Sequence, residues 1–427
     1  MFIKPAKRLV GEISLPGDKS ISHRAAIVAA LAEGTTRIEN FSTADDCAAT
    51  LDCLEKLGVK IERDKTTIVV RGVGKNGFSQ PKDALDCRNS GTTMRLLAGV
   101  LAGQNFTSVL TGDESLQKRP MKRVIKPLEL MGAKIESNDG RAPLEITGKN
   151  PLGAISFEPP VASAQIKSCV LLAGLNADGE TEVIEKTPTR DHTERMFRWC
   201  GANVENEGEK IKISGDARLS ASEINVPSDV SSAAFFLVAA ACLRDSDLIL
   251  KNVGLNPSRM AIIEVLQNFG ANIEILNNNE TANEPRGDLR VSGGELKQTQ
   301  ANVLRGAVIA NLIDELPILA VFGTQLENGL EIRDAAELRV KESDRISAVA
   351  ENLRRMNAQV EEFEDGLLVH KSQLKGAKID SFGDHRIAMS FAVAGLLATG
   401  ETEIENAEVA AVSFPNFFDL LEKIAVR

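Results

Sequence analysis

The chain has 427 residues, 43% of them hydrophobic and 26% charged, with a formal net charge of −10. This length exceeds one ordinary hydrophobic core and predicts two domains of about 200 residues each. The negative balance argues against nucleic-acid binding driven by bulk charge, so an anionic ligand would need a local basic site. No apolar run approaches the length of a membrane span, and the first residues lack a signal-like apolar segment, so we expect a cytoplasmic protein.

The first predicted helix begins near Lys19 and is almost wholly apolar from Ala25 to Ala32. A helix that is apolar on every side is typical of a buried helix. Its polar first turns, with Lys19 and Arg24, therefore indicate where it meets water or a ligand. The free backbone N–H groups and the helix dipole make this end positive, which favours an anion such as phosphate. A capped helix whose charges are merely solvated is the alternative for this segment alone.

Five more apolar helices are predicted along the chain, each preceded by polar or charged residues. These leading segments are 88–95, 160–165, 227–232, 314–315 and 383–386. A strand follows each apolar helix, and the pattern returns after about 70 residues, which is too long for an ordinary solenoid repeat.

A second, amphipathic helix also recurs and ends in a residue that tolerates the left-handed conformation. These terminal residues are Gly58, Gly132, Gly201, Gly270 and Asn357. Each unit is thus expected to contain a strand, a buried helix, a strand, an amphipathic helix and one or two more strands. Six such α/β units divide naturally into two groups of three.

Charged residues gather at several of the predicted helix starts. Arg119 lies in a basic loop, residues 339–345 precede an amphipathic helix, and residues 384–386 open the last apolar helix. Cations at a helix N-terminus oppose the dipole at a cost of up to about 1 kcal/mol each unless an anion is bound. Such local inconsistencies are expected at functional sites.

Histidines and cysteines do not form a metal site in this sequence. The six cysteines lack a C-x-x-C pair, so buried free thiols are expected, and no two histidines have metal-ligand spacing. His192 and His370 are expected to face solvent. His23 and His385 stand beside arginines at helix starts, where nearby cations favour the neutral imidazole.

Four motifs together resemble the EPSP synthase (3-phosphoshikimate 1-carboxyvinyltransferase) family over essentially the whole chain. They are P-G-D-K-S-I-S-H-R (16–24), R-N-S-G-T-T-M-R (88–95), R-V-K-E-S-D-R (339–345) and G-D-H-R-I-A-M (383–389). The resemblance implies a two-domain enolpyruvyltransferase fold, an inside-out α/β barrel in which each domain has three βαβαββ repeats around buried parallel helices. It implies that residues 1–17 plus 229–427 form domain I, with the acid/base residues for phosphoenolpyruvate. Residues 18–228 would form domain II, on the shikimate 3-phosphate side.

The resemblance also implies an enzyme that transfers the enolpyruvyl group of phosphoenolpyruvate to the 5-hydroxyl of shikimate 3-phosphate. The catalytic residues would be Lys19, Asp314 and Glu342, with Asp314 as base for the hydroxyl, Glu342 for proton traffic at C3, and Lys19 assisting both steps. Phosphoenolpyruvate contacts would be Lys19, Gly91, Arg119, Gln165, Lys341, Arg345 and Arg386. Shikimate 3-phosphate contacts would be Lys19, Ser20, Arg24, Ser163, Ala164, Gln165, Asp314 and Lys341. No cofactor or metal is expected, and the partners would be these two small molecules, without nucleic acid or membrane, in a monomer.

Several positions depart from the pattern of many family members. Val412 stands where a lysine often reaches phosphoenolpyruvate, so one cationic contact is missing or supplied elsewhere. The other replacements are Ala164 for a common serine, His23 for a frequent asparagine and Ser90 for a frequent alanine. Lys167 and Arg190 are expected to offer substitute charge toward the shikimate phosphate.

Three other functions are weighed at this stage. The related UDP-N-acetylglucosamine enolpyruvyltransferase carries a cysteine on a mobile loop, but the corresponding 111–119 loop here has none. A non-catalytic anion-binding protein of the same fold would have no use for Asp314 and Glu342, because carboxylates repel an anionic ligand. The RNA-cyclase relatives of this fold would need nucleotide-binding features that the sequence lacks.

Overall fold

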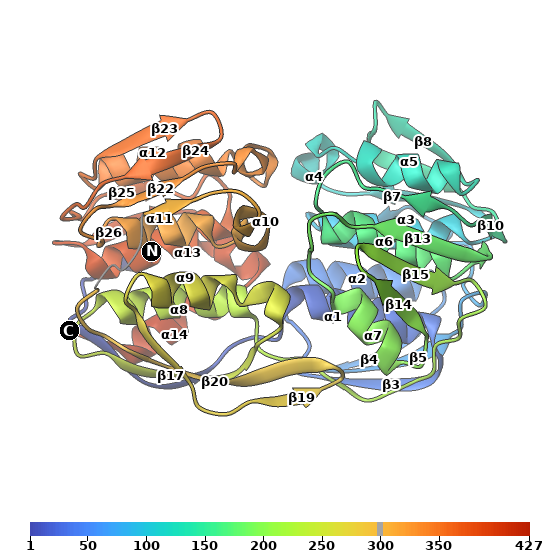
Figure 1. The fold of residues 1–427 in the computed structure, drawn as a ribbon, viewed down its shortest axis with the longest axis horizontal. Coiled ribbons are helices and arrows are strands. Elements are labelled where there is room, and N and C mark those ends of the chain that lie inside the picture. Colours follow the sequence, from blue (N-terminus) through green and yellow to red (C-terminus); the bar gives the residue numbers. More distant parts are fainter. Residues whose placement is uncertain (297–301) are drawn as a thin grey trace. The chain divides into compact units, whose positions relative to one another are not determined.

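The computed structural model describes residues 1–296 and 302–427, which fall into two compact units (Figure 1). Unit 1 consists of Met1–Pro16, Pro227–Asn279 and Pro285–Arg427, and unit 2 consists of Gly17–Val226 and Glu280–Glu284.

The domain division expected from the sequence assigned residues 280–284 to the first domain, whereas the structure groups them with unit 2. Two contacts explain the difference. Ala282 is buried in the hydrophobic core of unit 2, and Glu284 accepts or shares a hydrogen bond with His192.

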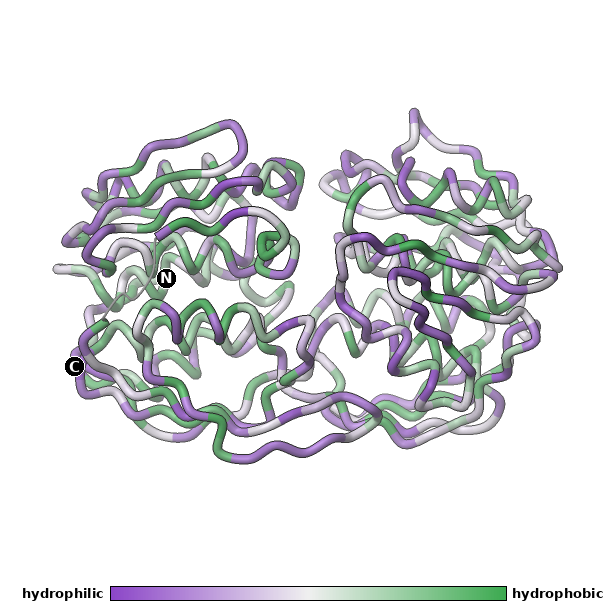
Figure 2. Tube along the Cα trace, in the orientation of Figure 1, coloured by the Kyte–Doolittle hydropathy of each residue, from purple (hydrophilic) through white to green (hydrophobic). Residues whose placement is uncertain are grey.

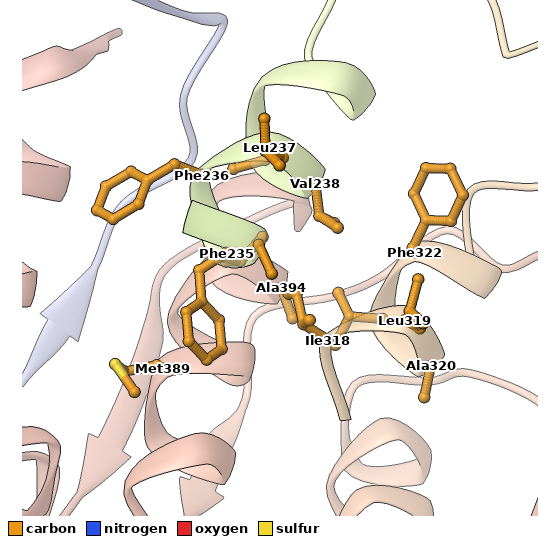
Figure 3. Close-up of a cluster of buried hydrophobic side chains, with 14 of the residues drawn as sticks. Phe235, Phe236, Leu237, Val238, Ile318, Leu319, Ala320, Phe322, Met389 and Ala394 are labelled. Carbon is orange, nitrogen blue, oxygen red and sulfur yellow. The ribbon is translucent and has the colours of Figure 1, made fainter. Parts of the chain in front are cut away.

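Three buried helices form the centre of each unit. In unit 2 they are α1 (Lys19–Leu31), α3 (Gly91–Ala102) and α6 (Ala164–Gly174). In unit 1 they are α8 (Val230–Cys242), α11 (Leu316–Gly323) and α13 (His385–Leu397). Figure 3 shows Phe235, Ile318 and Met389, which come from α8, α11 and α13 respectively and belong to one apolar cluster. The apolar patterns predicted all six helices, and this prediction is confirmed.

Amphipathic helices contact both the central helices and the strands, and the central helices also contact the strands directly. They are α2 (Asp45–Lys56), α5 (Lys122–Leu130), α7 (His192–Trp199), α9 (Ala261–Asn268), α12 (Arg345–Arg355) and α14 (Phe417–Ile424). Shorter helices are α4 (Glu114–Lys118), α10 (Val308–Leu312), η1 (Pro257–Arg259), η2 (Ala336–Val340) and η3 (Ala407–Val412). The five expected terminal residues have positive φ, from 66° at Asn357 to 102° at Gly132, as the sequence predicted.

Sheets surround the helices of each unit, and Figure 2 shows hydrophilic colour concentrated on these outer strands and turns. Unit 2 has three four-stranded sheets and one small pair of strands. The first sheet has the order β16 (Ile224–Asn225)-β3 (Glu33–Glu39)-β5 (Thr67–Val73)-β4 (Lys60–Asp64). The second has the order β6 (Leu85–Asp86)-β7 (Thr107–Thr111)-β9 (Arg141–Thr147)-β8 (Lys134–Asn138). The third has the order β11 (Ser156–Phe157)-β13 (Glu180–Ile184)-β15 (Lys210–Ser214)-β14 (Val204–Glu207), and the pair is β10 (Leu152–Gly153)-β12 (Ala177–Asp178). The described part of unit 1 has three sheets. The largest has the order β18 (Asn272–Ile275)-β20 (Glu284–Ser292)-β17 (Asp247–Gly254)-β2 (Arg8–Ser14)-β27 (Ala425–Val426), and β19 (Asn279–Thr281) pairs with β20. The second has the order β21 (Val303–Leu304)-β22 (Leu330–Ile332)-β24 (Gly366–Val369)-β23 (Val360–Phe363), and the third has the order β1 (Phe2–Ile3)-β26 (Thr402–Glu405)-β25 (Lys378–Asp380).

The same strand pairing recurs in the six sheets other than the small pair β10-β12. The strand that follows each buried helix pairs in parallel with one partner, as β7 does with β6 and β22 with β21. In the first repeat of each unit this parallel partner comes from a distant part of the chain. Strand β2 precedes α1 but pairs with β17, and β16 precedes α8 but pairs with β3. The chain passes from one unit to the other at residues 16–17 and 226–227, and it enters unit 2 once more for residues 280–284.

Three properties of the described residues bear on function. None of their helices has both the length and the hydropathy of a membrane span. Within 1–296 and 302–427, His, Cys, Asp and Glu side chains form no group of three or more suited to a metal ion. All six cysteines are free, and five of them are buried, with Cys242 partly exposed.

Candidate active site

The predicted site residues fall into two groups, one in each unit. Unit 2 contains Lys19, Ser20, Arg24, Gly91, Arg119, Ser163, Ala164 and Gln165. Unit 1 contains Asp314, Lys341, Glu342, Arg345 and Arg386. Most of these residues lie in the first turn of a helix or directly before it.

Side chains cap the starts of five of the six buried helices. Asp18 accepts a hydrogen bond from the Ile21 N–H at 2.8 Å, and Ser90 accepts one from the Thr93 N–H at 3.1 Å. Capping of this kind fixes the helix ends while the remaining N–H groups keep the end positive. The exception is α11, which begins after Glu315 without a side-chain cap.

Lys19 and His23 occupy the first turns of α1. The Lys19 Nζ lies 2.8 Å from Asp46 Oδ2, and His23 Nδ1 lies 2.7 Å from Thr50 Oγ1. Burial, opposed by Asp46 and assisted by Lys19 and Arg24, lowers the pKa of His23 to about 3. The prediction that His23 is neutral is confirmed, although burial contributes more than the neighbouring cations.

Arg24 is a buried guanidinium held by neutral oxygen atoms. It donates to the Ser20 carbonyl at 2.9 Å, to Ser168 Oγ at 2.8 Å and to Thr193 Oγ1 at 2.7 Å. Burial lowers its pKa to about 10, so the group is still charged at neutral pH. Within the described residues these bonds use three of its five N–H donors, which leaves donors suited to a phosphate or carboxylate.

Two hydrogen-bonded pairs of polar side chains lie near Gly91 at the start of α3, and one of them reaches the start of α6. Arg95 Nη1 donates to Gln165 Oε1 at 2.7 Å, and Arg119 Nη2 donates to Asn89 Oδ1 at 2.7 Å. A Cβ on Gly91 would lie 2.8 Å from Arg95 Nη1 and 3.5 Å from Arg119 Nη1. The backbone at Gly91 therefore approaches the Arg95 guanidinium more closely than a side chain would allow, whereas the distance to Arg119 is an ordinary contact.

Ser163 and Ala164 begin α6, where the Ser163 hydroxyl faces the Ile166 N–H at 3.5 Å. The expectation that Lys167 offers charge to the shikimate phosphate is wrong. Its side chain is only 1% exposed, and Nζ lies 2.9 Å from Glu185 and 2.8 Å from Glu194. One turn into α6, this position points into the unit, and the two glutamates compensate the buried charge.

Arg345 is the centre of the group in unit 1. Its Nε donates to Asp384 Oδ2 at 2.8 Å and its Nη2 to Glu342 Oε2 at 2.6 Å. Burial alone would lower the pKa of Arg345, but Asp384 and Glu342 outweigh burial and raise it. Burial likewise opposes ionisation of Asp384, yet Arg345 keeps the pKa of this carboxyl below its usual value.

Asp314 lies beside three cations. Its carboxylate is 3.7 Å from Arg345 Nη1 and 3.8 Å from Arg386 Nε, and its carbonyl accepts a hydrogen bond from Arg386 at 2.9 Å. Burial lowers the pKa of Lys341, while Asp314 acts in the opposite direction. Unit 1 thus brings together all five of its predicted site residues.

Sequence reasoning missed several residues that hold the predicted ones. Asp46, Thr193 and Ser168 carry no recognisable local pattern, whereas Arg95 and Asp384 stand inside motifs that were singled out.

His192 was expected to face solvent, and this expectation is wrong. The side chain is 1% exposed, and Nδ1 lies 2.7 Å from Glu284 Oε1 because residues 280–284 cover it. Val412 ends η3 and is half-buried. Because valine is uncharged, this position supplies no cation for phosphoenolpyruvate.

Two units, each with three buried helices inside βαβαββ repeats and basic side chains near helix starts, define the two-domain enolpyruvyltransferase class of fold. Comparison with known proteins identifies the family. The EPSP synthase (3-phosphoshikimate 1-carboxyvinyltransferase) family matches residues 3–421, and the chain belongs to this family.

Individual relatives are similar over their full length. A 3-phosphoshikimate 1-carboxyvinyltransferase of Pelotomaculum thermopropionicum is 53% identical, with 100% of this chain and 99% of the relative covered. One of Desulforamulus reducens is 50% identical, with both chains covered completely. A solved structure of EPSP synthase from Acinetobacter baumannii has a TM-score of 0.89 at 44% identity and covers 100% of this chain and 98% of that one.

Proposed function

We propose that this chain transfers the enolpyruvyl group of phosphoenolpyruvate to the 5-hydroxyl of shikimate 3-phosphate and releases phosphate, a step of aromatic amino acid biosynthesis. The observation that carries the proposal is the family match over residues 3–421, in a chain that keeps both carboxylates, Asp314 and Glu342, among cations.

The reaction is an addition followed by an elimination. The 5-hydroxyl oxygen attacks C2 of phosphoenolpyruvate while C3 gains a proton, which gives a tetrahedral ketal phosphate. Loss of a proton from C3 and cleavage of the C2–O bond to phosphate then give the enol ether. Both steps need a group that accepts a proton and a group that donates one, so paired carboxylates suit the chemistry.

We assign Asp314 as the base for the hydroxyl, Glu342 as the proton carrier at C3, and Lys19 as an assistant to both steps. Arg345 supports the assignment of Glu342, because its Nη2 donates a hydrogen bond of 2.6 Å that orients the Glu342 carboxylate, and its charge lies 3.7 Å from the carboxylate of Asp314. Lys341, Arg345 and Arg386 would bind phosphoenolpyruvate from unit 1.

Unit 2 would supply the rest of the anion binding. Gly91, Arg119 and Gln165 are assigned to phosphoenolpyruvate together with Lys19. For shikimate 3-phosphate we assign Lys19, Ser20, Arg24, Ser163, Ala164, Gln165, Asp314 and Lys341. Arg24 supports this assignment because neutral oxygens hold it, which leaves its charge for an anionic ligand.

The protein would act as a cytoplasmic monomer on these two small molecules. Full-length relatives that carry the name 3-phosphoshikimate 1-carboxyvinyltransferase favour this activity over the UDP-N-acetylglucosamine reaction. They equally favour it over a non-catalytic anion-binding role.

The test is phosphate release from shikimate 3-phosphate plus phosphoenolpyruvate, with each substrate omitted in turn. We expect release only with both substrates, and a fall of about 10²–10⁴-fold in kcat for Glu342→Gln and for Asp314→Ala, as for removal of a general acid or base. Glu361→Gln is the matched control, because Glu361 is an exposed carboxylate of unit 1 whose partner is His370. Its kcat should equal that of the unaltered enzyme.

Two outcomes would contradict the proposal. Release with UDP-N-acetylglucosamine but not with shikimate 3-phosphate would reassign the substrate. No release with either acceptor, from protein that binds phosphoenolpyruvate, would indicate an anion-binding role.

A further inference from the structure

Glu315, directly after Asp314, has a nearly fully buried carboxylate that the mechanism above does not use. Its side chain is 2% exposed, and Oε1 accepts a hydrogen bond from the Ser231 hydroxyl. The same hydroxyl accepts a hydrogen bond from Arg259 Nη2, which itself lies 3.6 Å from Glu315 Oε1. Arg259, Ser231 and Glu315 therefore form one connected buried group.

This group joins three separate elements of unit 1. Arg259 ends η1, Ser231 lies in the first turn of α8, and Glu315 immediately precedes α11. Since α11 lacks a side-chain cap, the contacts of Glu315 fix its start instead. The carboxylate also meets the positive end of the α8 dipole, where a negative charge is favourable.

Stability alone does not account for such a group. Burying two charges costs free energy of desolvation that their attraction does not fully repay, so a buried ion pair is weak evidence for stabilisation. The buried group of Arg259, Ser231 and Glu315 instead restrains the position of the three backbone segments that carry these residues. The segment held here carries Asp314.

The position of the Asp314 side chain is set in part by the position of its backbone. Arg345 and Arg386 lie 3.7 and 3.8 Å from its carboxylate and attract it. Arg386 donates a hydrogen bond to the carbonyl of Asp314 at 2.9 Å, and Ser231 donates one to the side chain of the next residue, Glu315. The peptide is thus restrained on both sides of the residue.

We propose that Glu315 is a positioning residue that aims the Asp314 carboxylate at its proton, with Ser231 and Arg259 as its anchors. The proposal rests on the proposed function, in which Asp314 is the base. Glu315 itself touches neither substrate in this account.

The experiment is a double-mutant cycle between Glu315→Gln and Asp314→Ala. The amide keeps the size of Glu315 and can accept from Ser231, but it removes the charge that faces Arg259. We expect kcat to fall about 10–100-fold, as for misplacement of a catalytic group, with both KM values little changed. In the Asp314→Ala enzyme, measured by single-turnover phosphate release, Glu315→Gln should cause no further fall, because its effect passes through Asp314.

Two further variants separate positioning from stability. Arg259→Lys keeps the charge but loses the guanidinium geometry, so it should lower kcat less than Glu315→Gln and show the same dependence on Asp314. Asp288→Asn is the control, because Asp288 pairs with Lys251 at 2.6 Å and contacts none of the assigned residues. It should lower the thermal midpoint without changing kcat.

An unchanged kcat in folded Glu315→Gln, or an equal fall with and without Asp314, would overturn the proposal. If Glu315→Gln does not fold, the Arg259→Lys cycle decides by the same criterion. Full activity of Asp314→Ala would instead contradict the assignment of Asp314 as base and so the proposed function.

Discussion

Arg24 in unit 2 and Arg345 in unit 1 are both buried guanidinium groups at helix starts, but their partners differ in charge. Three neutral oxygens hold Arg24, whereas carboxylates of Asp384, Glu342 and Asp314 surround Arg345. The pKa values differ accordingly, since burial lowers that of Arg24 and the carboxylates raise that of Arg345.

The difference shows how one repeated architecture serves two kinds of chemistry. A guanidinium held by neutral groups keeps its charge for a ligand, which suits binding of a phosphate ester. A guanidinium among carboxylates orients them by hydrogen bonds, as Arg345 does for Glu342 and Asp384. The surroundings of Arg24 therefore favour anion binding, and those of Arg345 favour fixed positions for the carboxylates that we propose for acid/base chemistry.

Replacing Arg345 should have the largest effect. Arg345→Met leaves the fully buried Asp384 without its cation, so we expect a loss of about 3–5 kcal/mol in the free energy of unfolding and loss of phosphate release. Urea unfolding followed by circular dichroism measures the first quantity. Arg355→Met is the control on the same helix, because Arg355 is 36% exposed and pairs with Glu351, and it should be nearly neutral. Equal stability of the two variants would contradict the central role of the ion cluster.

Replacing Arg24 should affect binding more than stability. Arg24→Met removes a charge that is costly to bury, while Ser168 and Thr193 still share a hydrogen bond at 2.7 Å. We expect the free energy of unfolding to change by about 1 kcal/mol or less and KM for shikimate 3-phosphate to rise about 100-fold. Unfolding can be followed by fluorescence of Trp199, the single tryptophan, which lies in unit 2. A stability loss as large as that of Arg345→Met would remove the contrast between the units.

A further effect should appear in the pH dependence of the free energy of unfolding. The pKa of His23 falls from 6.5 unfolded to about 3 folded, so between these values only the unfolded state binds the proton. Stability of unit 2 should therefore decrease as pH falls below 6.5, by up to about 1.4 kcal/mol per pH unit. The lowered pKa of Asp384 acts only below its usual 3.8, where protonation removes its stabilising charge.

Urea unfolding monitored by Trp199 fluorescence between pH 6.5 and 4.5 measures this slope. His23→Asn should flatten it, whereas His370→Asn should not, because His370 is exposed. The same slope in the enzyme and in His23→Asn would show that His23 does not cause the acid sensitivity.

The sequence by itself determined the repeated architecture and most of the candidate site. Six apolar helices with polar starts, and glycine or asparagine after five of the six amphipathic helices, are local patterns that a single segment reveals. The motifs around Lys19, Gly91, Arg345 and Arg386 are equally local, because the residues of each lie within a few turns of chain.

Only the tertiary structure decided which partners these residues have. Arg24 bonds Thr193 from 169 residues away, Arg345 bonds Asp384 from 39 residues away, and His192 is covered by Glu284 from 92 residues away. Lys167 was misassigned for the same reason, since its burial follows from the packing of α6 rather than from its neighbours in sequence. Burial and pairing depend on contacts between distant segments, and a local pattern specifies an element but not what packs against it.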